Sequence, residues 1–460
     1  MCFFSVLRIF AAVFIPIFIF MYSNKEIWKV SYPILLGLLA QNVINVTDTA
    51  FLGHIGEVEL GAAAMGGLLY ICMYTIAFGF STGAQILIAR RNGEGRFHEV
   101  GPIVMQGGFF LFMLALLTFL LMLGFAPALI RLIVSSDVIY NATNEFMYWR
   151  MWGFFFSFVN VIFRALYIGV TRTKVLTMNA VVMALINVGL DYAMIFGHFG
   201  FPVMGLKGAA LASVIAEGCS LLFFLIYTRL KVDRKKYGFY KAFHLNWDMQ
   251  GKILGISSFT MLQYFLSMSV WFIFFMAIER LGQRDLAIAN IVRSIYIVLL
   301  IPVQALSTTA NTLVSNLIGA GGVAHVLKLL RKITLISFVI VSACVAVLYI
   351  APELFLSIYT SDPALIEASI PSIYVVGAGM IVSSIGNVYF SGVSGTGNTQ
   401  AALWLESFTL VIYALYIFWV GWYLKASVSI CFTTELVYYS LLFITSFVYF
   451  KKAKWQNKKI

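Results

Sequence analysis

The residues best suited to chemistry in this sequence are a few acids placed within long apolar stretches. Asp48 shares one helical face with Gln41 and Asn45, which precede it by seven and three residues. Asp191 follows Asn187 by one helical turn. A charge at the centre of a bilayer costs about 2.5–3.5 kcal/mol on insertion scales, so an acid kept there indicates a function. We predict that the two acids bind an ion, with the three amides in their hydrogen-bond network.

Two different ions fit this group of side chains. Desolvation and mutual repulsion favour protonated carboxyl groups, whereas carboxylate and amide oxygens together suit a hard cation such as Na⁺. The sequence therefore predicts an ion-binding site at Asp48, Asp191 and Asn187 that holds either a proton or Na⁺. The alternative is that each acid is a structural group satisfied by its neighbours.

Four other charged residues in apolar stretches lack such polar neighbours. Glu217, Glu406 and Glu435 have no second polar cluster in the sequence around them, so a structural and a functional role stay open for each. Arg293 needs an acidic or carbonyl partner within a membrane span, and a structural role is as open for it as a substrate-binding one.

Motifs that suggest enzymatic chemistry are present but lack their context. Gly79-Phe-Ser-Thr-Gly83 matches the GxSxG nucleophile elbow, which needs a strand-to-helix turn and a triad histidine, but it lies in a long apolar stretch. Gly392-Val-Ser-Gly-Thr-Gly397 resembles a phosphate loop without the Lys-Ser/Thr that follows in such loops. The five cysteines and five histidines show no CxxC or HExxH spacing. We therefore expect no enzyme activity, no cofactor and no zinc site.

The elements that must position these residues are apolar helices. Hydrophobic residues make up 61% of the 460 residues and charged residues only 11%, against about 25% charged in soluble domains. Residues 103–126, 175–196 and 333–350 contain no Lys, Arg or Glu, and about 20 such residues span a bilayer as a helix. They lack the two-residue alternation of membrane barrel strands. The sequence therefore predicts an all-α, polytopic membrane protein and excludes a soluble fold.

Twelve membrane helices follow from these stretches. We place them near residues 30–53, 60–89, 100–126, 142–170, 177–197, 206–230, 253–279, 286–315, 327–350, 368–393, 401–421 and 427–450. The loops between them are alternately basic and acidic, and the positive-inside rule puts the basic loops in the cytoplasm. The net charge of +12 therefore reflects topology, and we expect no nucleic-acid partner.

The first 22 residues do not fit this scheme. They are apolar, precede the basic residues Lys25 and Lys29, and lack a small-residue cleavage site typical of a signal peptide. Either they form a thirteenth span with an external N-terminus, or translation begins at Met21. We favour the second interpretation, which places both termini in the cytoplasm.

An internal repeat at an offset of 226 residues predicts the architecture. Residues 55–64 match residues 281–290, and Gly93 falls on Gly319 at the same offset. Six spans return the chain to its starting side of the membrane, so the two halves thread in the same direction. Parallel repeats of this kind are typical of transporters that rock between two access states.

With these features the chain resembles the multidrug and toxic compound extrusion (MATE) family, most closely its DinF-like branch, over about residues 24–450. The motifs that carry the resemblance are Pro33, the stretch Asp48-Thr-Ala-Phe-Leu-Gly-His-Ile-Gly, the stretch Asn187-Val-Gly-Leu-Asp191-Tyr, and the doubled pattern that ends at Gly93 and Gly319.

The resemblance implies a twelve-helix, two-lobe fold that exports organic cations or other small molecules in exchange for H⁺ or Na⁺. It implies that Asp48 and Asp191 are the coupling acids, with Asn187 and Asn160 in their hydrogen-bond network. Ile44 stands where some relatives of this branch have a tyrosine, so the network differs here. The second half has no mid-membrane acid in its first helix, unlike other branches, which favours coupling in the first half.

We therefore interpret the chain as a secondary antiporter of the bacterial inner membrane, with six-helix lobes at residues 23–235 and 236–460. We expect a cationic small-molecule substrate, contact with the lipid bilayer and a monomeric state. Three alternatives stay open. A flippase for lipid-linked sugars would need a larger basic cavity. An intramembrane hydrolase would need a histidine partner for its serine. A receptor or scaffold would give the buried acids no function.

Overall fold

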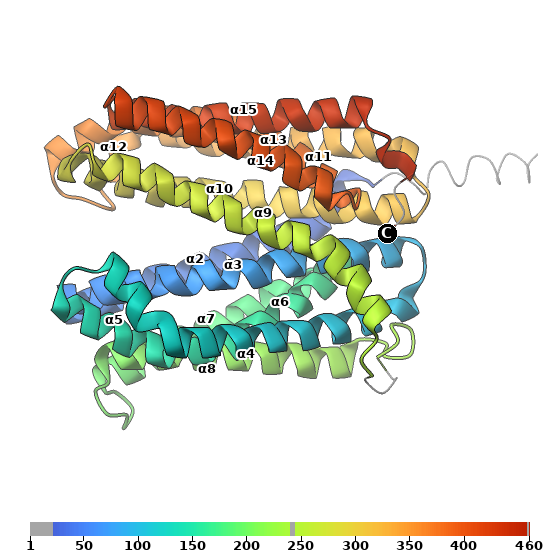
Figure 1. Ribbon diagram of the computed structural model, residues 1–460, viewed down its shortest axis with the longest axis horizontal. Coiled ribbons are helices and arrows are strands. Elements are labelled where there is room, and N and C mark those ends of the chain that lie inside the picture. The colour runs from blue at the N-terminus through green and yellow to red at the C-terminus, as the bar shows by residue number, and fades with distance from the viewer. Residues whose placement is uncertain (1–21, 240–243, 458–459) are drawn as a thin grey trace, which may run out of the picture. The chain divides into compact units, whose positions relative to one another are not determined.

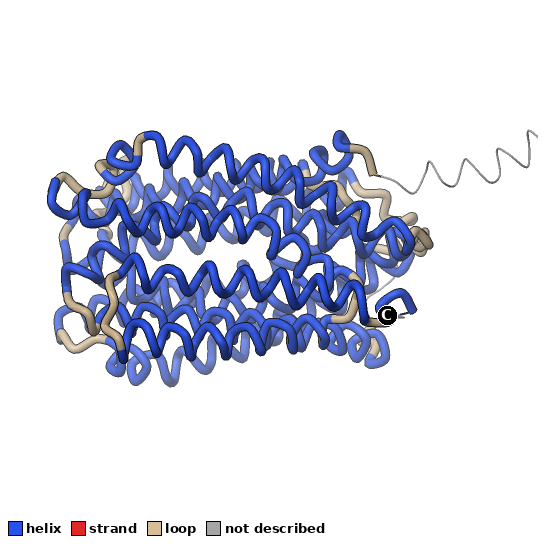
Figure 2. Tube along the Cα trace, turned by 90° about the horizontal axis from the view of Figure 1, so that it is seen from above, coloured by secondary structure: helices blue, strands red, loops and turns tan. Residues whose placement is uncertain are grey.

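The computed structural model describes residues 22–239, 244–457 and 460, and within them it is helical without strands (Figures 1 and 2). Its α-helices are α2 (Asn24–Ile55), α3 (Glu57–Gly93), α4 (Val100–Ile133), α5 (Asp137–Arg150), α6 (Phe154–Gly169), α7 (Lys174–Phe196), α8 (Gly205–Lys231), α9 (Trp247–Glu279), α10 (Gln283–Gly319), α11 (Val326–Ile350), α12 (Pro352–Leu356), α13 (Pro363–Gly395), α14 (Thr399–Ile417) and α15 (Val428–Lys452). Short helical turns lie at Phe97–Glu99, Met151–Gly153, Val323–His325, Phe418–Tyr423 and Trp455–Asn457.

Twelve of the described helical segments are long and apolar enough to cross a membrane, which confirms the predicted number of spans. One of these segments, Asp137–Gly169, joins α5 and α6 through the turn Met151–Gly153. The sequence predicted a single unbroken helix there. Residues 1–21, to which the thirteenth-span and Met21 hypotheses refer, lie outside the described residues.

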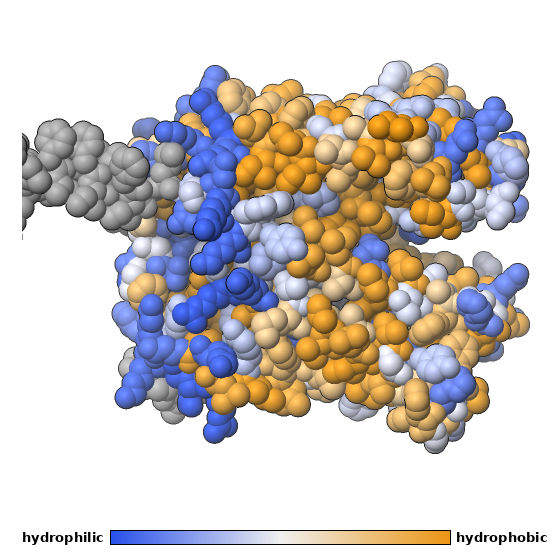
Figure 3. Space-filling model, turned by 180° about the vertical axis from the view of Figure 1, so that it is seen from behind, coloured by the Kyte–Doolittle hydropathy of each residue, from blue (hydrophilic) through white to orange (hydrophobic). Residues whose placement is uncertain are grey.

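Large apolar side chains are exposed along these spans. Leu123 of α4 is 51% exposed, and Trp404 and Leu415 of α14 are 69% and 64% exposed. Figure 3 shows a broad apolar area over the middle of the face drawn, with hydrophilic side chains gathered toward its ends. An apolar surface of this extent is the surface that a bilayer solvates, in agreement with the predicted membrane fold.

Several helices are longer than predicted, because hydropathy marks only the apolar part of a helix. α3 continues beyond its predicted end through Arg90 to Gly93, and α10 continues to Gly319. The turns that follow contain Gly95 and Gly321 with φ angles of +73° and +84°. These left-handed angles favour glycine, so the repeat preserves the residue that ends each helix.

The chain packs as two compact units, and each is described by itself. The N-terminal unit contains Pro33–Ile88 and Phe97–Met268. Among the described residues, the C-terminal unit contains residues 22–32, Ala89–Arg96 and Ser269–Ile460. These bounds differ from those of the repeat lobes, because most of α9 packs in the N-terminal unit. The lobe boundary between residues 235 and 236 therefore stays a prediction about the repeat.

The repeated glycines at the ends of α3 and α10 allow a close helix crossing within the C-terminal unit. A Cβ atom on Gly93 would overlap the backbone carbonyl of Asn316, and one on Gly319 would overlap the carbonyl of Arg90. Asn92 Nδ2 also donates to Asn316 Oδ1 at 2.6 Å. The doubled glycine pattern is thus a packing requirement.

The GxSxG match is likewise explained by packing, here in the N-terminal unit. A Cβ on Gly79 would lie 2.7 Å from Met261 Cα of α9, and one on Gly83 would lie 2.5 Å from Ser257 Cα. Thr260 Oγ1 donates to the Gly79 carbonyl oxygen at 2.7 Å. The two glycines let α3 and α9 approach closely, and they do not form a nucleophile elbow.

Candidate functional site

The two predicted coupling acids meet inside the N-terminal unit. Asp191 of α7 is 0% exposed, and Oδ1 of Asp48 on α2 is enclosed. The two carboxyl groups lie close enough for a hydrogen bond to each other. Among the described residues, Asp48 Oδ1 and both Asp191 oxygens lack an ordinary hydrogen-bond donor. A hydrogen bond between two carboxyl groups needs a proton on one of them, so this pair is suited to hold a shared proton.

Asn187 lies one turn before Asp191 and is 1% exposed. Neither its Nδ2 nor its Oδ1 has a hydrogen-bond partner in the described part of the chain. A buried amide without hydrogen bonds costs about 1–3 kcal/mol, so Asn187 lowers the free energy of unfolding. The other predicted amides lie differently, because the side chains of Gln41 and Asn45 are exposed.

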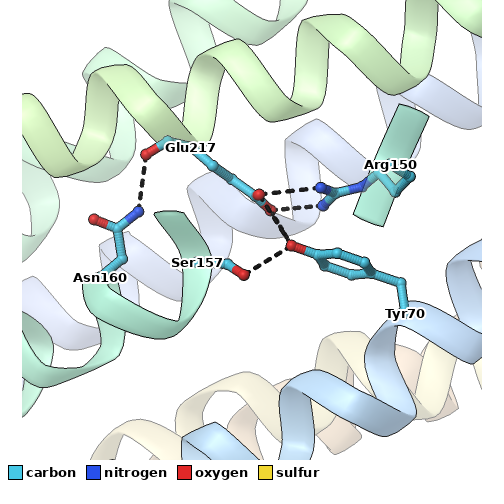
Figure 4. A network of polar contacts seen from close by, with 5 residues as sticks. All are labelled: Tyr70, Arg150, Ser157, Asn160 and Glu217. Carbon is cyan, nitrogen blue, oxygen red and sulfur yellow. Dashed lines mark hydrogen bonds and ion pairs between the residues drawn. The ribbon is translucent and has the colours of Figure 1, made fainter. Parts of the chain in front are cut away.

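A second polar cluster in the same unit surrounds Glu217 of α8 (Figure 4). Arg150 Nη2 donates to Glu217 Oε1 at 2.6 Å, and Nη1 donates to Oε2 at 3.0 Å. The Tyr70 hydroxyl lies 3.0 Å from Glu217 Oε2 and 2.8 Å from Ser157 Oγ. Asn160 Nδ2 donates to the Glu217 backbone carbonyl at 2.9 Å. Glu217 therefore has the partner cluster that the sequence did not reveal.

The guanidinium of Arg150 also stacks on an aromatic ring. Its central carbon lies 3.7 Å from the centroid of Tyr70, and the Arg150 and Glu217 side chains are only 13% and 8% exposed. A guanidinium uses its face for the ring and its edge for the carboxylate. This is a buried, bidentate ion pair rather than a solvated surface contact.

The break between α5 and α6 makes room for this ion pair. Gly153 lies in the turn Met151–Gly153, and a Cβ there would overlap Arg150 Nη1 and Glu217 Oε2 and lie 2.9 Å from the Tyr70 hydroxyl. Arg150 ends α5, whereas Ser157 and Asn160 lie on α6. The irregular turn and its glycine thus position the cluster.

The Arg150–Glu217 ion pair and the Asp48–Asp191 pair lie close enough to interact electrostatically. The charge of Arg150 acts on both Asp48 and Asp191. Arg150 therefore binds one carboxyl group of the N-terminal unit directly and acts on two more through its field. Asn160 donates to the backbone carbonyl of Glu217, and its Oδ1 has no partner among the described residues.

The C-terminal unit holds its buried acids in a different way. Glu435 accepts hydrogen bonds from the hydroxyls of Tyr413 at 2.9 Å and Tyr296 at 3.3 Å. The Tyr296 hydroxyl lies 2.7 Å from that of Tyr439. Glu406 accepts from Tyr438 at 3.2 Å. The partner clusters of both acids are tyrosines from neighbouring helices.

Arg293 of α10 also lies in the C-terminal unit, against aromatic rings. Its guanidinium carbon is 5.2 Å from the Phe275 centroid and 5.8 Å from the Trp271 centroid. Its buried Nε has no hydrogen-bond partner among the described residues. The acidic or carbonyl partner expected for it is not found at that atom.

The described residues contain no group of three or more His, Cys, Asp or Glu side chains that could hold a metal ion. A Na⁺ site at Asp48, Asp191 and Asn187 uses amide as well as carboxylate oxygens, and it stays a prediction. Sequence reasoning missed Arg150, Tyr70 and Ser157, because their contacts with Glu217 and with one another join distant parts of the chain. One signal was available, since Ser157 follows Arg150 by seven residues, two helical turns.

Comparison with known proteins gives a consistent result. The MatE family model matches residues 33–193 and again residues 260–420. The chain is 26% identical over 382 residues to a probable multidrug resistance protein NorM of Thermotoga maritima, covering 82% of this chain and 81% of the relative. It is 22% identical over 350 residues to a protein of that name from Idiomarina loihiensis, covering 75% of this chain and 74% of the relative.

Solved structures share the fold at low sequence identity. A MOP superfamily transporter from Pyrococcus furiosus superimposes with a TM-score of 0.86 at 17% identity, over 95% of this chain and 97% of the other. A eukaryotic MATE transporter superimposes with a TM-score of 0.85 at 15% identity, over 94% and 96%.

Proposed function

Because this chain belongs to the MatE family, we propose that it is an antiporter that exports small organic molecules in exchange for protons held by Asp48 and Asp191. As a family member it is a membrane transporter and not an enzyme. With its twelve spans it is a multi-pass protein of the bacterial inner membrane. The placement in the DinF-like branch stays a prediction.

The contact between the two carboxyl groups carries the proposal. Two ionised carboxylates in contact repel each other strongly at low dielectric, whereas one shared proton turns the repulsion into a hydrogen bond. Asp48 and Asp191 lie on different helices, α2 and α7. Gain or loss of one proton therefore changes the force between these helices. This gives a physical link from proton binding to a change in packing.

We propose a proton rather than Na⁺ as the coupling ion because the two carboxyl groups lie within hydrogen-bond reach of each other. The positive charge of Arg150 opposes the binding of either cation and does not choose between them. A proton is held in a covalent O–H bond and needs no shell of oxygen ligands. Sodium coupling is the second candidate, because the unsatisfied oxygens of Asp191 and Asn187 suit a hard cation.

The energetics permit coupling to a single proton. One charge that moves through about 150 mV releases roughly 3.5 kcal/mol, from about 2.3 kcal/mol per 100 mV. Because about 1.4 kcal/mol corresponds to a factor of ten, one proton sustains a substrate gradient of several hundredfold. In the proposed cycle, protonation on one side of the membrane closes the α2–α7 contact and releases substrate, and deprotonation on the other side reopens it.

Transport in proteoliposomes tests the proposal. Accumulation of ethidium is measured under an imposed proton gradient and, separately, under a sodium gradient. We expect the proton gradient alone to drive it, and Asp48→Asn and Asp191→Asn to abolish it. Asp137→Asn is the matched control, because Asp137 is an exposed acid paired with Arg131 at 2.6 Å. Full activity in both acid variants would overturn the coupling mechanism, and sodium-driven uptake would replace the proton with Na⁺.

A further inference from the structure

A guanidinium without an acidic partner lies in the same unit as the coupling acids. Arg164 of α6 is partly buried, and its guanidinium carbon lies 4.6 Å from the ring centroid of Phe78 on α3. Tyr264 of α9 packs edge-on against Phe78 with the ring centroids 5.2 Å apart, and Tyr74 lies 6.1 Å from Phe78. Arg164 therefore lies on an aromatic surface built by two helices of the N-terminal unit, α3 and α9.

The edge of the Arg164 guanidinium is not used by the described residues. Its contact there is the Phe78 ring, with no hydrogen bond or ion pair. A guanidinium carries five N–H donors in its plane, which a ring contact leaves available. A cation kept within a membrane span without an anion is costly, which indicates a function.

Arg150 shows which group a guanidinium on an aromatic ring binds through its N–H donors. Arg150 also lies on a ring, that of Tyr70 at 3.7 Å, and its two terminal nitrogens bind the Glu217 carboxylate. The two arginines are 14 residues apart in the chain. The two arginines therefore differ in their partners, because Arg150 has a carboxylate and Arg164 has none within the described part of the chain.

The C-terminal unit contains an independent example of this chemistry. Arg293 lies on the rings of Phe275 and Trp271, and its buried Nε is without a partner in the described chain. Each unit thus contains a guanidinium on an aromatic surface with donors left over. Arg293 does not follow from the twofold repeat, since Gly67 stands 226 residues before it.

We propose that Arg164 binds an anionic group of the transported molecule, a carboxylate or a phosphate, beside an apolar body that contacts the surrounding aromatic side chains. The inference rests on the proposed export function and specifies its substrate class: organic anions and zwitterions with an aromatic or apolar body. It extends the prediction of a cationic substrate, because a zwitterion carries both charges.

Equilibrium binding to the purified, full-length protein in detergent micelles tests this assignment without any ion gradient. Carboxyfluorescein is the anionic aromatic ligand, ethidium is the cationic one, and both are followed by fluorescence anisotropy. Arg164→Gln removes the charge, and Arg164→Lys keeps a charge but not the bidentate edge. Arg131→Gln is the matched control, because Arg131 also lies over a tyrosine ring, that of Tyr140 at 5.1 Å, but is 53% exposed and paired with Asp137.

We expect carboxyfluorescein to bind the wild type and Arg131→Gln equally. Its affinity should fall about tenfold or more in Arg164→Gln, since a charge-assisted hydrogen bond is lost, and by a smaller factor in Arg164→Lys. Ethidium affinity should not fall in either variant. Unchanged carboxyfluorescein affinity in Arg164→Gln, or no carboxyfluorescein binding to the wild type, would overturn the proposal.

Competition between ligands for the wild-type protein tests anion recognition even if Arg164→Gln does not fold. Benzoate and phenyl phosphate should displace carboxyfluorescein, whereas benzyl alcohol, which has the same ring and no charge, should not. The stronger of the two anions identifies the group as carboxylate or phosphate. Equal displacement by benzyl alcohol would refute anion recognition. These binding experiments use the wild-type acid pair and no ion gradient, so their result does not depend on whether Asp48→Asn abolishes proton-driven transport, and the two proposals fail separately.

Discussion

Replacing Gly153 by alanine tests the geometry around Glu217 most directly. The added methyl group would overlap Arg150 Nη1 and Glu217 Oε2, so the ion pair must separate or the turn must shift. Both side chains are at most 13% exposed, so water cannot replace the lost partner. Breaking a buried ion pair costs about 3–5 kcal/mol.

Part of that cost is offset in the unfolded state. An alanine restricts the unfolded backbone and so stabilises a protein by about 0.4–1 kcal/mol where its conformation is compatible. The net loss expected for Gly153→Ala is therefore about 2–4 kcal/mol in the free energy of unfolding. It is measured by denaturant unfolding in mixed micelles, with tryptophan fluorescence as the signal.

The control is Gly189→Ala on α7, where a Cβ meets no atom within 4 Å. Alanine should stabilise that helix by about 0.5–1 kcal/mol. A double replacement, Arg150→Met with Glu217→Leu, removes the atoms that the methyl group would overlap. In that background Gly153→Ala should cost far less than in the wild type. If Gly153→Ala is as stable as Gly189→Ala, the cluster does not have the geometry of Figure 4.

Three further variants follow from the same reasoning. Asn187→Leu removes a buried amide whose two polar atoms lack partners among the described residues. It should raise the free energy of unfolding by about 1–3 kcal/mol and abolish proton-driven transport. A variant that is destabilised but still transports would contradict this. Gly319→Ala should lose about 1–3 kcal/mol by overpacking, whereas Gly255→Ala, with open space around it, should not, and equal unfolding free energies would contradict the crossing of α3 and α10. Glu435→Leu leaves the Tyr413 hydroxyl without its hydrogen-bond acceptor. The free energy of unfolding should therefore fall by at least about 1 kcal/mol in the same assay. An unchanged free energy of unfolding would contradict a structural role for this contact.

Most of the fold could be predicted from the sequence, because burial in lipid constrains composition over whole helices. Apolar length gave the number of spans, which is confirmed. The break at Met151–Gly153 could not be predicted, because the glycine there is required by side chains from α3 and α8, which are remote in sequence. Helix ends were also missed where polar residues such as Arg90 continue the backbone hydrogen bonds of α3.

The buried acids of the N-terminal unit are visible in the sequence, but their partners could not be predicted from it. Asp191 has an amide one turn away on its own helix, a pattern visible in the sequence. Glu217 has no such neighbour, and its partners Arg150 and Tyr70 lie 67 and 147 residues away along the chain. Local spacing carries no information about contacts of that range without the topology of the helices.

The contrast between the buried acids of the two units supports coupling in the N-terminal unit. Both Glu435 oxygens accept hydrogen bonds from tyrosines on α10 and α14, so this acid joins three helices and is satisfied as it stands. The polar side-chain atoms of Asp191 and Asn187 have no hydrogen-bond donor or acceptor of the usual kind among the described residues. Such unsatisfied groups lower stability, and proteins keep them where function requires them. An ion that binds there supplies the missing interactions and leaves again at little cost. Glu435 would have to break two hydrogen bonds to do the same.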